Sequence, residues 1–146
     1  MQRIQGTHPR ARDLPPVVPA LLVADVIVFG LAAVGHLAVA IPLGLRTLVE
    51  APILPAAVVE GLNALVLGAV AYGALAGRAW AWRAAIAGHL FALASVALGV
   101  WSLSMGYGPR SDLNDVYHGL MVVLLTLGLT RLLAPGSAAA SVREAA

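Results

Sequence analysis

The chain lacks cysteine and lysine entirely, and arginine supplies all nine of its Lys-or-Arg residues. Without cysteine, the protein forms no disulfides, thiolate metal sites, iron–sulfur clusters or covalently attached c-type haem. A thiol relay of its own, linked to a quinone, is excluded for the same reason. Any redox role therefore depends on other ligands or on a partner protein.

Charged residues are also scarce, at 11% of the 146 residues, whereas 60% are hydrophobic. An ordinary soluble domain carries about 25% charged residues. With a mean hydropathy of +0.89, this chain cannot cover a surface that faces water. The composition predicts an integral membrane protein of one domain, with the lipid bilayer as its surroundings.

The basic pI, near 9.7, does not indicate nucleic-acid binding. In a soluble domain such a value would favour it. Here the arginines stand singly near the ends of apolar runs, where they contact lipid headgroups and set topology. We therefore expect no nucleic-acid partner.

Four apolar runs have the length needed to cross the hydrocarbon layer, which takes about 20 helical residues. They cover residues 20–41, 53–76, 80–103 and 112–133. The predicted fold class is all-α, an integral membrane four-helix bundle. Residues 1–19 are expected to form a disordered polar tail and residues 134–146 a flexible tail rich in Ala and Ser.

The distribution of arginines predicts the orientation. Seven arginines lie in the N-terminal tail, the second link and the C-terminal end, whereas the other two links hold one each, Arg46 and Arg110. Cytoplasmic segments carry the excess of positive residues. Both termini are therefore predicted in the cytoplasm, for a multi-pass protein of the cell membrane.

Small and aromatic residues give packing signals. Trp80, Trp82 and Trp101 lie near the ends of the third run, as interfacial anchors do. Gly73 and Gly77 have the GxxxG spacing that permits close helix approach. A homodimer is one partner hypothesis, because four helices alone would make a narrow pathway for a transporter.

Polar residues within the runs indicate an outward-facing site. At a rise of 1.5 Å per residue, His36, Glu60 and His118 all lie about 8–10 Å from the outer ends of their helices. Such groups cost several kcal/mol in a bilayer unless they are paired or hydrated, and by default they mark function. The predicted ligand or proton site comprises His36, Glu60, Asn63, Asn114, Asp115 and His118.

Each of these residues also has a structural interpretation. Asp112 and Asp115 suit a helix N-terminus, where a cap and an acidic first turn are favourable. His36 could form a helix-to-helix hydrogen bond of about 0.6 kcal/mol. Glu60 is harder to explain structurally, because a buried carboxylate must be paired or protonated.

A second level lies nearer the cytoplasm and contains Asp25 and His89. The two could form a structural ion pair or one step of a proton path. Alternatively, Asp25 lies close enough to the interface to be simply hydrated.

The outer residues suit several chemistries. His36, His118 and Glu60 could hold a divalent metal, and the two histidines could ligate a b-type haem. A proton-coupled transporter of a small solute or metal ion would use Glu60 and His36, with Asp25 and His89 continuing the path inward. A membrane enzyme could use the same groups for acid–base chemistry on a lipophilic substrate. No HExxH, phosphate-loop or dinucleotide motif supports another enzyme class.

Two segments resemble the DoxX-like group of small four-helix membrane proteins. Segment 30–37, with Gly35-His36, is similar to the small-residue end of that group's first helix, where a basic residue follows a glycine. Segment 60–68, beginning Glu60-Gly61, is similar to its acidic-glycine pattern in the second helix. The fourth helix departs from the pattern at segment 114–118. The resemblance implies a small binding or accessory subunit with a membrane redox partner, matched at His36 and Glu60.

Overall fold

The computed structural model describes residues 14–44, 46–49 and 52–134. In order, the elements are α1 (Val17–Gly35), β1 (Ile41–Leu43), β2 (Arg46–Leu48), α2 (Leu54–Leu75), α3 (Ala81–Ser104) and α4 (Asp112–Leu133). Each of the four helices is long and apolar enough to cross a membrane, which confirms the predicted class of helical bundle. The predicted tails fall largely on residues 1–13 and 135–146, outside the described residues.

The first helix differs most from its predicted bounds, 20–41. It begins at Val17, within the predicted tail, and ends at Gly35. The apolar sequence continues to Ile41, but the proline at position 42 disfavours helical backbone at the preceding residue. Ile41 instead begins a small antiparallel hairpin, in which it pairs with Leu48. Apolar composition alone does not distinguish this hairpin from another helical turn.

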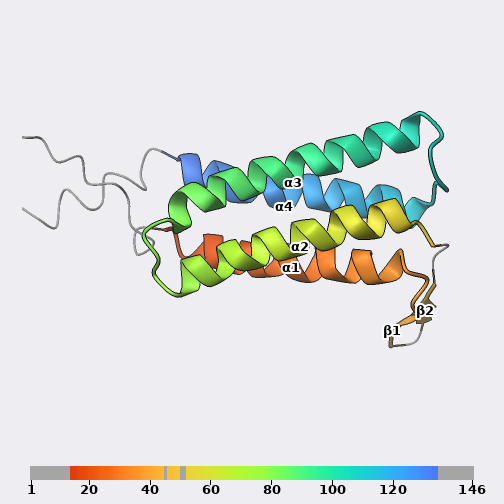
Figure 1. Cartoon of the computed structure of the whole chain (residues 1–146), viewed down its shortest axis with the longest axis horizontal. Coiled ribbons are helices and arrows are strands. Elements are labelled where there is room, and N and C mark those ends of the chain that lie inside the picture. The colour runs from red at the N-terminus through yellow and green to blue at the C-terminus, as the bar shows by residue number, and fades with distance from the viewer. Residues whose placement is uncertain (1–13, 45, 50–51, 135–146) are drawn as a thin grey trace, which may run out of the picture.

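The helices form a ring in which α1 contacts α2, α2 contacts α3, α3 contacts α4, and α4 closes on α1. Figure 1 shows the ring as two layers, with α1 and α2 below α3 and α4. Large side chains fill the centre, among them Leu22, Phe29, Leu67, Met121 and Leu125. Many other large apolar side chains are exposed on the outside of the bundle. Helices that are apolar all round suit a lipid environment.

Glycines end two of the helices. Gly77 after α2 has φ +64° and Gly106 after α3 has φ +81°, a left-handed backbone that favours glycine. Arg78 then donates its N–H to the Gly73 carbonyl at 2.9 Å, which completes a Schellman motif. Both glycines of the predicted GxxxG pair therefore have a role within this chain. Gly77 turns the backbone, and the Trp80 ring lies against Gly73.

Two other glycines make room for histidine rings between α3 and α4. The His89 ring of α3 lies against Gly128 of α4, and the His118 ring of α4 lies against Gly99 of α3. Each glycine follows the histidine of its own helix by ten residues, and the helices run in opposite directions (Figure 1). The two contacts are therefore reciprocal, as in a local two-fold arrangement.

We expect Gly128→Ala to destabilise the bundle. The new methyl group would collide with the buried His89 ring. Overpacking of this kind costs about 1–3 kcal/mol. Thermal unfolding in detergent, followed by circular dichroism, measures the effect. The matched control is Gly119→Ala, on the same helix, where an added methyl group meets no atom within 4 Å. Equal stability of the two variants would contradict this packing.

Candidate functional site

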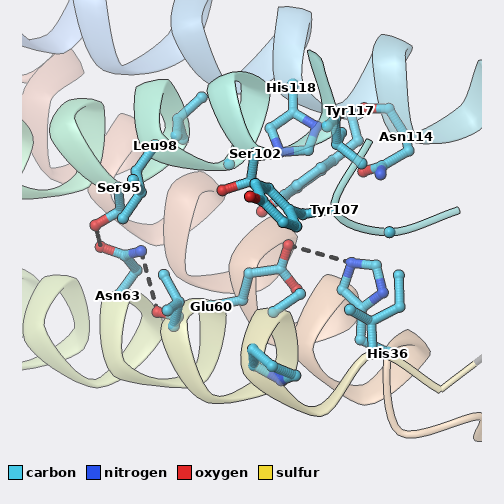
Figure 2. A pocket seen from close by; sticks show the side chains of 18 of the residues that line it. His36, Glu60, Asn63, Ser95, Leu98, Ser102, Tyr107, Asn114, Tyr117 and His118 are labelled. Atoms are coloured by element: carbon cyan, nitrogen blue, oxygen red, sulfur yellow. Dashed lines mark hydrogen bonds and ion pairs between the residues drawn. The ribbon is translucent and has the colours of Figure 1, made fainter. Parts of the chain in front are cut away.

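A cavity of about 320 Å³ opens at the end of the bundle that carries the hairpin and the α3–α4 loop. All four helices contribute to it (Figure 2). Its walls are mainly apolar, with Val59, Val96 and Leu98 among them. The polar side chains that line it are His36, Glu60, Asn63, Ser95, Ser102, Tyr107, Asn114, Tyr117 and His118.

His36 and Glu60 form an ion-pair contact in this cavity. His36 Nε2 lies 3.4 Å from Glu60 Oε1, and both side chains are buried. His36 stands at the C-cap of α1 and not well inside a helix as predicted, because α1 ends at Gly35. Its backbone carbonyl accepts the Ile53 N–H at 2.9 Å, which ties the end of α1 to the start of α2.

His118 faces the cavity from α4 (Figure 2). Its Nδ1 lies 2.8 Å from the Asn114 carbonyl oxygen. A carbonyl oxygen accepts only, so Nδ1 carries the hydrogen and Nε2 of the neutral ring is an acceptor. Asn114 and His118 thus share a helix face, as their spacing predicts.

Two tyrosines lie between Glu60 and His118 (Figure 2). Tyr117 packs edge-on against His118 and against Phe29, with ring centroids 5.1 and 6.4 Å apart. Tyr107 follows Gly106, and its N–H bonds to the Ser102 carbonyl in a second Schellman motif. Neither tyrosine was predicted as a site residue, because aromatic residues near the ends of apolar helices are expected to be interface anchors. The Gly106-Tyr107 pair after an apolar helix was the available signal for Tyr107.

An amide–hydroxyl contact joins α2 to α3 at the side of the cavity. Asn63 Nδ2 donates to the Val59 carbonyl at 3.1 Å, and Ser95 Oγ donates to Asn63 Oδ1 at 3.4 Å. Asn63 thus lies where its prediction placed it, whereas Ser95 was not among the predicted site residues.

Asp115 does not line the cavity. Its Oδ2 lies 3.1 Å from Arg110 Nε, in an ion pair whose side chains are 47% and 68% exposed. The predicted cap at Asp112 is also wrong. Ser111 is the N-cap residue, and its Oγ accepts the Asn114 N–H at 3.2 Å. Ser and Asp are comparable caps, so sequence alone does not choose between adjacent candidates.

Asp25 and His89 meet beneath the cavity, between α1 and α3. Asp25 Oδ2 lies 3.8 Å from His89 Nε2, and both side chains are fully buried. The interpretation of Asp25 as a hydrated interfacial residue is therefore wrong. The burial follows from the helix ring, which turns Asp25 toward the bundle centre and away from the outer surface of the bundle.

The arrangement does not favour the metal and haem hypotheses. Among the described residues, no group of three or more His, Cys, Asp or Glu side chains could hold a metal ion. His36 Nε2, the nitrogen through which histidine usually ligates haem iron, faces Glu60. The geometry favours an organic ligand with both apolar and hydrogen-bonding parts.

No known protein family matches this chain, and no curated protein or solved structure does either.

We expect the contact between His36 and Glu60 to contribute to stability. Removing one partner from a buried pair costs about 3–5 kcal/mol, because the other charge is left without compensation. His36→Ala should therefore lower the unfolding free energy strongly. In a double-mutant cycle with Glu60→Ala, the combined loss should fall short of the sum of the single losses.

Asp115→Ala is the control for this cycle, because exposed ion pairs contribute only about 0–1 kcal/mol. Strictly additive losses at His36 and Glu60 would show that the two side chains do not interact.

Proposed function

We propose that this chain is a multi-pass protein of the cell membrane that binds a small amphipathic organic molecule in its outer cavity. The observation that carries the proposal is the division of the cavity lining. Apolar walls surround one polar set, built around the contact between His36 and Glu60. Ligand sites commonly combine an apolar lining with a few placed polar groups.

The size of the cavity limits the ligand. At about 30 Å³ for each water-sized group, 320 Å³ accommodates about ten non-hydrogen atoms. A substituted single ring fits this volume. A longer apolar tail would have to extend out of the cavity.

The polar groups favour oxygen substituents on such a ring. The hydroxyl group of Tyr107 can donate to a carbonyl oxygen, and the Glu60 carboxylate and His118 Nε2 can accept from hydroxyls. A quinone head group and its hydroquinone use these two patterns. The DoxX-like resemblance at Gly35-His36 and Glu60-Gly61 supports the same class, because it implies a subunit that works with a membrane redox partner.

The proposed orientation places both termini in the cytoplasm. The cavity lies at the end of the bundle with the hairpin and the α3–α4 loop, so it would open to the outside (Figure 1). The support for this orientation is the excess of arginines in the other segments.

The absence of cysteine makes this orientation testable with single-cysteine variants. Thr47 in β2 and Ala79 in the α2–α3 turn are both exposed and lie at opposite ends of the bundle. In intact cells, a membrane-impermeant maleimide should label Thr47→Cys. It should label Ala79→Cys only after permeabilisation, and the reverse pattern would refute the orientation.

Ligand binding can be measured by calorimetry on the protein in lipid nanodiscs, with duroquinone and durene as matched probes. The two have the same methylated ring, but durene has no oxygen atoms. Duroquinone should bind at least about tenfold more tightly, because durene leaves the polar groups of the cavity unpaired.

A pair of serine variants tests the location of this binding. Ser102 lines the cavity, and Ser104 is exposed two residues further along α3. Ser102→Phe should fill the cavity and abolish duroquinone binding, whereas Ser104→Phe should leave it intact. Equal binding by the two variants, or equal affinity for the two probes, would refute the proposed site.

A further inference from the structure

Asp25 and His89 are not part of the cavity, and their polar atoms are unusually placed. Neither oxygen of Asp25 has a hydrogen-bond partner within the described part of the chain, and neither does His89 Nε2. Buried polar groups in native proteins are almost always hydrogen-bonded. A pair that served only to join α1 to α3 would be expected to close this 3.8 Å gap.

The hydrogen bond of the other His89 nitrogen indicates that the pair must hold one further proton. His89 Nδ1 donates to the Ala85 carbonyl at 2.7 Å, so the neutral ring presents the lone pair of Nε2 to Asp25. A carboxylate facing a lone pair is repelled, and an isolated buried charge is costly. One proton, on Asp25 Oδ2 or on His89 Nε2, removes both penalties and leaves the pair without net charge.

The pair lies nearer to the cavity than to the far end of the bundle. Phe29, which lines the cavity, is four residues from Asp25, or about 6 Å along α1. Ser95 is six residues from His89, or about 9 Å along α3. In the other direction, eight residues separate Asp25 from the first residue of α1, about 12 Å. The far end is packed with apolar core side chains.

The two levels of the bundle are built alike. At the outer level, Glu60 of α2 and His118 of α4 line the cavity from diagonally opposite helices. At the inner level, Asp25 of α1 and His89 of α3 also come from diagonal helices, but they lie in contact. Each histidine donates Nδ1–H to the carbonyl four residues earlier and lies against a glycine of the other helix. The inner level repeats the acid and histidine of the outer one.

Within residues 14–44, 46–49 and 52–134, no other ionisable group lies beside the inner pair. On the described parts of the four helices, the remaining ionisable side chains lie either at the outer level or exposed on the surface. The outer set comprises His36, Glu60, Asp112, Asp115, Tyr117 and His118, and the exposed set comprises Tyr72, Arg83 and Arg131.

We propose that Asp25 and His89 form an inner proton-binding site that is filled through the outer cavity. In the resting state the pair shares one proton. An incoming proton from the cavity binds to the Asp25 carboxylate while His89 Nε2–H remains, and His89 then releases its Nε2 proton back to the cavity. Transfer of the proton from Asp25 Oδ2 to His89 Nε2 restores the starting state, so one proton enters for each one that leaves.

Nitrogen NMR of the protein in lipid bilayers, with ¹⁵N-labelled histidine, tests this site directly. The chain has four histidines, so His8→Gln, His36→Gln and His118→Gln variants assign the His89 signals by elimination. As the pH is lowered from a value at which the pair has lost its shared proton, the His89 Nε2 signal should move toward the protonated form while Nδ1 keeps its hydrogen. In Asp25→Asn this response should shift or disappear, whereas Asp115→Asn, which removes an exposed carboxylate, should leave it unchanged. A His89 ring held in one protonation state at all pH values, or unaffected by Asp25→Asn, would overturn the proposal.

Access through the cavity is tested by exchange of the His89 Nε2 proton with solvent, measured in the same samples. Ser102→Phe should slow this exchange at least about tenfold relative to Ser104→Phe. Equal rates would show that protons reach the pair by another route, which also overturns the proposal. Both measurements use the protein without added ligand, so their outcome is separate from that of the quinone-binding experiment.

Discussion

A carboxyl group buried among apolar side chains cannot stand alone, and this constraint governs how the four helices are arranged. Glu60 of α2 meets His36 at the end of α1, and Asp25 of α1 meets His89 of α3. These two contacts restrict how far α1 can slide along its neighbour α2 and relative to the diagonal helix α3. Asp115 escapes the constraint because it is exposed, and it pairs with Arg110 close by in the sequence. Burial, and not the residue type, decides which carboxylates organise the fold.

The sequence was sufficient for the number of helices and for the bounds of α4, because long apolar runs and a polar lead-in mark them clearly. Helical rise alone also placed His36 and Glu60 at a common depth. The hairpin at residues 41–48 could not be predicted, because its apolar residues resemble one more helical turn. Depth arithmetic also carries no information on which way a side chain faces. Asp115 was therefore grouped with the site, and Asp25 was interpreted as hydrated although it is fully buried.

The tyrosines illustrate a second limit of the sequence. An aromatic residue near the end of a membrane helix is usually an interface anchor. Tyr107, which is 71% exposed, also lines the cavity because Gly106 adopts a left-handed backbone, and Tyr117 lies inside the bundle, where it packs on Phe29. Both placements depend on backbone direction and on a contact between helices far apart in sequence. Likewise, nothing in the sequence indicated that Gly99 and Gly128 make room for the rings of His118 and His89.

The end of α1 joins two functions within a single residue. The side chain of His36 contacts Glu60 in the cavity, and its backbone carbonyl holds the N–H of Ile53 beyond the hairpin. A displacement of the hairpin would pull on this carbonyl and rotate the imidazole that contacts Glu60. A movement of the hairpin is consequently transmitted to the interior of the bundle. A neighbouring protein that bound the hairpin from outside would change the shape of the cavity without entering it.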